Sequence, residues 1–193
     1  MLLLSEQLKN VPVMSLQTGT ELARTTECII DPRSLSIPAL YVSGPQVDHH
    51  PAVLHTDDIR EAGELGFIID GSTKIMELDG LVRLNEIIGY GFSLLSCTVF
   101  DQLNTKLGVV SDFSFDPQNF AIQQIYIRQP FLKRFSSTSH IINRSQIVSI
   151  TRDKIVVDTP INQEPAKESA ESPTGFINPF RSQSPQPDQT DTD

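Results

Sequence analysis

The segment DHHPAVLHTDD gathers side chains that could bind a metal ion. Imidazole and carboxylate groups are typical ligands of transition metals, and this stretch holds Asp48, His49, His50, His55, Asp57 and Asp58. Their spacing differs from the paired helical spacing of HExxH, and Pro51 places some of them in a loop. We therefore expect a solvated loop and no metal cofactor. A small hydrolase or metal enzyme that uses His49, His50 and His55 remains as a third function hypothesis.

Other enzyme signatures are missing from the sequence. GxSxG, Walker A and dinucleotide-binding motifs do not occur, so the pattern predicts a protein that is not an enzyme and holds no cofactor. Cys28 and Cys97 lack the spacing of a zinc site or a disulfide framework. We expect both to be small core side chains.

The strongest surface signal is the segment RQPFLKRFSSTSH, residues 128–140. Aromatic and basic side chains alternate there, a mixture that suits an acidic protein, a phosphate backbone or an anionic membrane. The alternative is that the rings cap the end of a barrel while the charges are merely solvated. The predicted binding residues are Arg128, Phe131, Lys133, Arg134 and Phe135.

A second candidate lies in the C-terminal tail. From Pro160 onward the chain is rich in Pro, Ser, Gln, Thr and acidic residues, a composition that predicts disorder over residues 160–193. The apolar segment GFINPF interrupts this tail and predicts a short linear motif, unless it arose by chance in a low-complexity sequence. Its residues of interest are Phe176, Asn178, Pro179 and Phe180.

These segments sit on a chain with an internal repeat. TTECIIDPRSLSIPALYV, residues 25–42, aligns with VSDFSFDPQNFAIQQIYI, residues 110–127, at one offset (116 − 31 = 85). A second block aligns residues 54–71 with 142–159 (142 − 54 = 88). A fixed period with a small change of offset indicates a duplicated unit with a loop insertion.

Each unit is predicted to consist of short strands. Runs of β-branched and apolar residues alternate with turn signals, and each Asp-Pro step predicts a turn in which Asp bonds the backbone two residues on. We expect an all-β chain with two tandem small barrels. The expected segments are a first domain 1–71, a partly helical connector 72–91, a second domain 92–159 and the tail 160–193.

The segment KLGVVSDFSFDP from Lys106 resembles the PRC-barrel family, whose usual pattern is lG-x-v-x-D, an apolar strand, Asp-Pro and an apolar return strand. ELARTTECIIDP from Glu21 fits with Ala23 at the position where the family prefers Gly, which matters only if the backbone there is left-handed. The resemblance covers roughly residues 10–71 and 92–159, and it implies a non-catalytic docking barrel. One member of the family is the barrel of a bacterial ribosome maturation factor.

The function predicted from these features is macromolecular docking. Net charge is −7 over residues 1–88, +2 over 89–159 and −4 over 160–193, so the acidic first half is a poor nucleic-acid surface. We expect a cytoplasmic chain with a protein partner, no small-molecule substrate and at most peripheral membrane contact. Ribosome maturation or RNA processing is the alternative, with a ribosome or RNA-associated complex as partner.

Overall fold

The computed structural model describes residues 1–48, 50–63, 65–128 and 140–158. Strands dominate this part of the chain, so the expectation of a mostly β protein is confirmed. Residues 1–159 form one compact unit. The tail 160–193, and with it the predicted GFINPF motif, lies outside the described residues.

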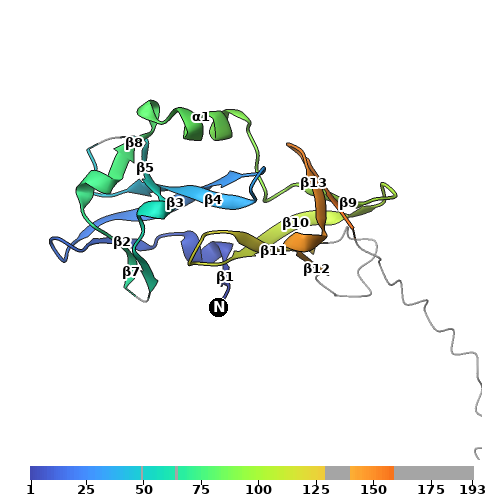
Figure 1. Ribbon diagram of the computed structural model, residues 1–193, viewed down its shortest axis with the longest axis horizontal. Coiled ribbons are helices and arrows are strands. Elements are labelled where there is room, and N and C mark those ends of the chain that lie inside the picture. The colour runs from blue at the N-terminus through green and yellow to red at the C-terminus, as the bar shows by residue number, and fades with distance from the viewer. Residues whose placement is uncertain (49, 64, 129–139, 159–193) are drawn as a thin grey trace, which may run out of the picture. The chain divides into compact units, whose positions relative to one another are not determined.

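The first sheet contains seven strands in the order β6-β7-β2-β3-β4-β5-β8 (Figure 1). Strands β2 and β7 run parallel, and the other neighbours run antiparallel. Strand β4 is buried over most of its length, with Ile37, Leu40 and Val42 in the hydrophobic core. The strands are β2 (Pro12–Ser15), β3 (Glu21–Asp31), β4 (Ser36–Ser43), β5 (Ala52–His55), β6 (Glu61–Gly63), β7 (Gly66–Ile69) and β8 (Ile75–Glu77).

The second sheet repeats this strand order as β13-β14-β9-β10-β11-β12, again with one parallel pair, β9 with β14. Strand β3 starts 85 residues before β10 (106 − 21 = 85), and β5 starts 88 residues before β12 (140 − 52 = 88). The offsets of the sequence repeat therefore reappear in the strands. The strands are β9 (Thr98–Asp101), β10 (Lys106–Phe115), β11 (Ile122–Arg128), β12 (His140–Asn143), β13 (Ile147–Ile150) and β14 (Lys154–Val157).

Two strands break the equivalence of the sheets. β1 (Leu3–Leu4) pairs with β10 of the second sheet, although it precedes the first sheet in the chain. β8 pairs with β5 at the edge of the first sheet, and no described strand occupies the equivalent place beside β12. Pairing among the described strands leaves both sheets open rather than closed into barrels.

The main hydrophobic core is shared by both sheets. Phe120 precedes β11, and its ring lies 5.8 Å from Phe67 of the first sheet in an edge-to-face arrangement. It also stacks on Phe115 at 5.8 Å. Leu35 and Ile37 of the first repeat belong to the same buried cluster as Phe113 and Ile125 of the second. Burial of this apolar surface is the main force that holds the halves together.

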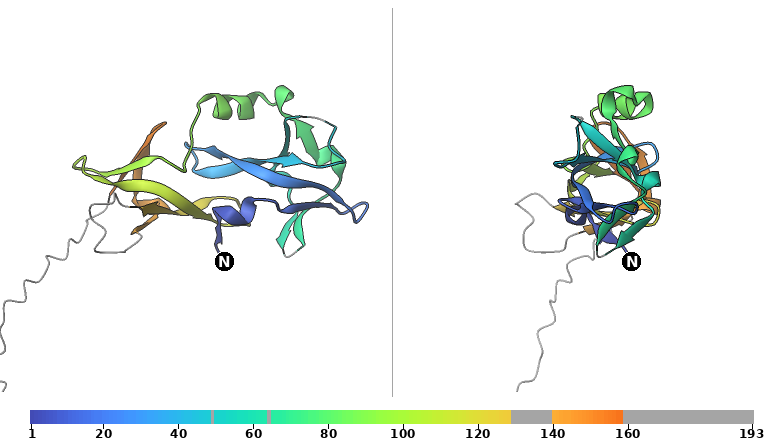
Figure 2. Two further views of the ribbon diagram at one scale, coloured as in Figure 1. Left: turned by 180° about the vertical axis from the view of Figure 1, so that it is seen from behind. Right: turned by 90° about the vertical axis from the view of Figure 1, so that its left-hand side faces the viewer.

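Helix α1 (Val82–Gly89) lies in the segment expected to be a partly helical connector. Its apolar side buries Leu84 and Ile87 against Ile29, Ala39 and Val53 of the first sheet. Figures 1 and 2 show the helix above one face of that sheet. This packing fixes the end of α1 beside the turn between β3 and β4.

Candidate functional site

The site is built on the two Asp-Pro turns. Asp31 Oδ1 accepts the backbone N–H of Arg33 at 2.9 Å, and Asp116 Oδ1 accepts that of Gln118 at 3.0 Å. Each carboxylate thus accepts a hydrogen bond from the backbone N–H two residues later, as predicted from the sequence. In the second turn Asn119 Oδ1 also accepts the N–H of Ala121 at 3.0 Å. The geometry of both turns is therefore fixed locally.

The two turns then join each other across the molecule. Ser36 and Ala121, which are equivalent in the repeat (121 − 36 = 85), form an antiparallel β-bridge. The N–H of Ile37 donates to the carbonyl of Phe120 at 2.9 Å, and the N–H of Ile122 donates to the carbonyl of Leu35 at 3.0 Å. These reciprocal bonds between equivalent residues are those of a self-complementary interface with two-fold symmetry.

Leu35 and Phe120 occupy equivalent places in this junction and share an unusual backbone. Their φ angles are 47° and 53°, a left-handed region that costs a non-glycine residue about 1–2 kcal/mol. Both side chains are nearly fully buried, and that burial offsets the cost. Neither residue was predicted from the sequence to belong to a site. The signal is an apolar residue three positions after each Asp-Pro proline.

Arg144 ties the second sheet to the first turn. Its guanidinium donates to the carbonyls of Leu35 at 2.7 Å, Ser34 at 2.5 Å and Ile122 at 3.2 Å. The equivalent residue of the first repeat, Thr56 (144 − 56 = 88), donates to the carbonyl of Ile37 at 2.8 Å. Arg144 therefore keeps the bond within its own repeat and adds two bonds across the junction.

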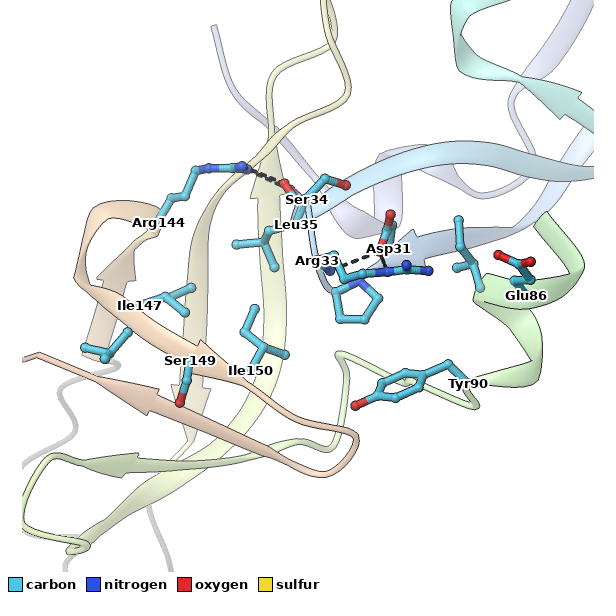
Figure 3. A pocket seen from close by; sticks show the side chains of 13 residues that line it. Asp31, Arg33, Ser34, Leu35, Glu86, Tyr90, Arg144, Ile147, Ser149 and Ile150 are labelled. Atoms are coloured by element: carbon cyan, nitrogen blue, oxygen red, sulfur yellow. Dashed lines mark hydrogen bonds and ion pairs between the residues drawn. The ribbon is translucent and has the colours of Figure 1, made fainter. Parts of the chain in front are cut away.

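An open cleft of about 800 Å³ lies beside this junction. Three segments distant in sequence form its walls: the turn Asp31–Leu35, the end of α1 with Glu86, Ile87 and Tyr90, and β13 with the Arg144 side chain (Figure 3). Volumes of about 300–1,000 Å³ are typical of small-molecule binding sites. The shared core holds the turn and β13 in place, and packing of Leu84 and Ile87 on the first sheet holds the helix.

The cleft combines apolar surface with a charged rim. Val148 and Tyr90 are 57% and 46% exposed, and Ile147 and Ile150 are partly buried. Arg33 extends from the turn toward Glu86 on the helix (Figure 3), and both are exposed. Such a surface suits a peptide segment with apolar side chains and flanking charges of either sign.

The predicted binding loop lies almost wholly outside the described residues. Arg128 ends β11 and is exposed, whereas Phe131, Lys133, Arg134 and Phe135 lie in the undescribed segment 129–139. The tail residues Phe176, Asn178, Pro179 and Phe180 also lie outside the described part. These predictions stay predictions.

The histidine-rich segment is spread over several elements. His50 is exposed and precedes Pro51 through a cis peptide bond, and His55 ends β5. Asp58 accepts a bond from Lys74 Nζ at 2.6 Å. Among the described residues, which exclude His49, no three His, Cys, Asp or Glu side chains come together as a metal site.

The cysteines lie in apolar surroundings. Cys97 is buried and Cys28 packs against the shared core. Burial raises the pKa of each thiol from its ordinary value of 9.0 to about 11. At neutral pH both thiols are therefore protonated and weakly nucleophilic.

No model of a known protein family matches this chain, and no curated protein sequence matches it. In the part of the chain that the structure describes, no helix has the length and hydrophobicity needed to cross a bilayer.

Proposed function

We propose that this protein is a non-enzymatic docking module that binds another protein through the cleft beside the Asp-Pro junction. We further propose that it consists of two tandem PRC-barrel-like units, residues 1–71 and 92–159, joined by the connector 72–91. The repeated strand order with matching offsets supports the duplication. The motif KLGVVSDFSFDP supports the family assignment.

The observation that carries the docking function is the construction of the cleft. Its walls come from both repeats and from α1, and the reciprocal bonds of Ile37 and Ile122 fix their separation. A preformed site binds without a large ordering cost, because little conformational entropy is lost on association. The exposed apolar atoms of Val148 and Tyr90 supply the surface that a partner would bury.

The predicted binding loop is proposed as a second contact. Arg128 marks its start at the end of β11, and Lys133 and Arg134 add positive charge. Charges at the rim of an interface mainly accelerate association and favour a partner of opposite sign. An acidic protein is therefore the preferred partner, ahead of a ribosomal or RNA-containing complex.

Site-specific photo-crosslinking in the source cells tests this function. A photoreactive residue at Val148, 57% exposed in the cleft, should crosslink to one or a few protein species. The matched control is Leu16, which is 64% exposed and lies outside the cleft lining. It should give no such products. Gradient sedimentation with mass spectrometry of the co-migrating material separates the alternatives. Crosslinks to RNA or ribosomal proteins at both positions would contradict protein docking through the cleft.

A further inference from the structure

One side of the junction between the repeats is filled by a guanidinium group of the chain itself. Arg144 of the second repeat reaches across the junction to the carbonyls of Ser34 and Leu35 (Figure 3). It also bonds the carbonyl of Ile122 within its own repeat. A guanidinium presents several N–H donors in one fixed plane, so a single group can serve all of these carbonyls. The arrangement is a guanidinium site that the chain occupies.

The equivalent position in the first repeat holds Thr56 in place of an arginine (144 − 56 = 88). Its hydroxyl donates to the carbonyl of Ile37 at 2.8 Å and lies 3.2 Å from that of Pro38, both in its own repeat. The threonine side chain is too short to reach across the junction as Arg144 does. The first repeat therefore makes the bond within the repeat without the two bonds across the junction.

The carbonyls that correspond to those two missing bonds belong to Asn119 and Phe120. They are the equivalents of Ser34 and Leu35 at the repeat offset (119 − 34 = 85). In the described part of the chain, the Phe120 carbonyl accepts only the N–H of Ile37, and the Asn119 carbonyl accepts no hydrogen bond. A carbonyl oxygen has two lone pairs, so both groups can accept a further donor.

A cavity of about 620 Å³ opens at this place. Ile37 and Thr56 line it from the first repeat, and Asn119 lines it from the second. Residues 80–84 and Ile87, from the segment that forms α1, complete the lining, and packing of α1 on the first sheet fixes this wall. The volume lies in the range of small-molecule sites and is ample for one arginine side chain.

The groups that line this cavity favour a cation. Asp31 and Asp57 contribute two carboxylates, and Arg83 contributes one guanidinium. Asp57 and Arg83 are exposed and form no ion pair with a described residue, whereas Asp31 pairs with Arg33 at 3.6 Å. The free carbonyl acceptors add further negative partial charge. Acceptors at several angles suit the planar fork of a guanidinium better than the compact ammonium of a lysine.

We propose that this cavity binds an arginine side chain of the partner protein, whose guanidinium donates to the carbonyls of Asn119 and Phe120 as Arg144 does on the other side. The cavity adjoins the cleft, with which it shares Asp31 and Ile87, so one partner can contact both. The partner as source of the arginine rests on the docking function proposed above. A single arginine is compatible with a partner that is acidic overall.

Binding of capped arginine, N-acetyl-arginine amide, tests the site on the full chain without a partner. It should shift the amide NMR signals of Thr56, Asn119 and Phe120 saturably, with a Kd in the millimolar range, because the probe makes few contacts. N-acetyl-citrulline amide, which has the same shape without the charge, should bind at least about ten-fold more weakly. Equal binding of the two probes, or no saturable shift at these amides, would overturn the proposal.

Substitution of Thr56 separates filling of the site from loss of the hydroxyl. Thr56→Arg copies Arg144 and should fill the cavity from within, so that capped arginine no longer shifts the amides of Asn119 and Phe120. Thr56→Val lacks the hydroxyl but leaves the cavity open, and should bind the probe within about two-fold of wild type. Should Thr56→Arg fail to fold, Asp57→Lys at the exposed rim should weaken the probe at least about three-fold, because it replaces an attractive charge by a repulsive one. Shifts that persist in Thr56→Arg, or an unchanged affinity in Asp57→Lys, would contradict the assignment.

The same variants test the partner as the source of the arginine. The Kd of the partner crosslinked at Val148 should rise at least about ten-fold with Thr56→Arg and stay within about two-fold with Thr56→Val. An unchanged Kd with Thr56→Arg would overturn the proposal that the partner supplies the arginine, and would leave docking through the cleft intact. A wild-type chain that crosslinks no partner at Val148 would instead contradict the docking function, and the titration with capped arginine still decides whether the cavity binds a guanidinium.

Discussion

Replacing Phe120 by alanine should break the junction between the two halves. The Phe120 ring is almost fully buried and lies against Phe67 and Phe115, both at 5.8 Å between ring centres. Truncation of a buried Phe to Ala typically costs about 3–5 kcal/mol. The left-handed backbone at residue 120 stays strained, since alanine keeps a Cβ atom. The full loss should therefore appear in the free energy of unfolding.

A double-mutant cycle isolates the part of this loss that crosses between the halves. Phe67 belongs to β7 of the first sheet, and Phe120 belongs to the turn that precedes β11. An edge-to-face ring pair contributes about 0.5–1.5 kcal/mol beyond its area burial. The variants Phe67→Ala, Phe120→Ala and their combination should yield a coupling energy in this range.

Urea unfolding followed by far-UV circular dichroism measures these energies, because the chain contains no tryptophan. Wild type should unfold in one transition, since both sheets share one core. Phe100→Ala serves as the control. The Phe100 ring lies beneath Lys154 at 4.4 Å and is only partly buried, so this variant should cost less than half as much. A loss below about 1 kcal/mol for Phe120→Ala, or no coupling with Phe67, would refute the interlocked junction.

Four further predictions follow from described contacts and from the sequence. Arg144→Ala should lower stability by about 1–2 kcal/mol in urea unfolding, because three carbonyls lose a charged donor. Arg144→Lys should recover part of the lost stability, because lysine keeps the positive charge but lacks the planar guanidinium with its several N–H donors. Pro117→Ala should cost about 1 kcal/mol or less in the same assay, since it acts mainly on the unfolded chain. Above pH 9, the folded protein retains thiol protons at Cys28 and Cys97 that the unfolded chain releases. The thiol contribution to stability should therefore be constant below pH 9 and fall toward pH 11, and stability of a Cys28→Ala, Cys97→Ala double variant should fall less steeply over that range. Lys133→Glu with Arg134→Glu should reduce partner capture and leave the thermal midpoint nearly unchanged, since exposed charges add little stability; equal capture at low salt would exclude the loop.

The sequence predicts local features well. Both Asp-Pro turns carry the expected carboxylate bond to the backbone, and the strands that flank them lie where the apolar runs indicate. Helix α1 likewise follows from the apolar spacing of Leu84 and Ile87. Each of these features depends on residues close together in the chain.

Strand pairs between residues far apart in the chain were not predicted from the sequence. Ile75–Glu77 was expected to be part of a connector, but it forms β8, because its partner strand β5 lies about 20 residues earlier. The pairing of Leu3 with Phe115 was also not predicted, because it joins residues far apart in the chain. The departure at Ala23 matters only if the backbone there is left-handed; Ala23 lies within β3, and the described left-handed positions do not include it.

The cleft was also beyond sequence reasoning. Its three walls come from the turn at Asp31, the helix end at Tyr90 and β13, and only the docking of the two turns brings them together. That docking depends on Leu35 and Phe120, which carry no polar or catalytic signature. The closure of each sheet into a PRC-type barrel stays a prediction.

The most direct test of docking through the cleft is the Kd of the crosslinked partner, purified and titrated against matched surface variants. Val148→Asp places a charge on the exposed apolar wall of the cleft, and Leu16→Asp places one at a comparably exposed position outside it. Burying an unpaired carboxylate in an interface is costly, so Val148→Asp should raise Kd at least about ten-fold. Leu16→Asp should leave Kd within about two-fold of wild type, and both variants should keep the wild-type unfolding midpoint. Equal Kd values for the two variants would contradict the cleft as the docking site.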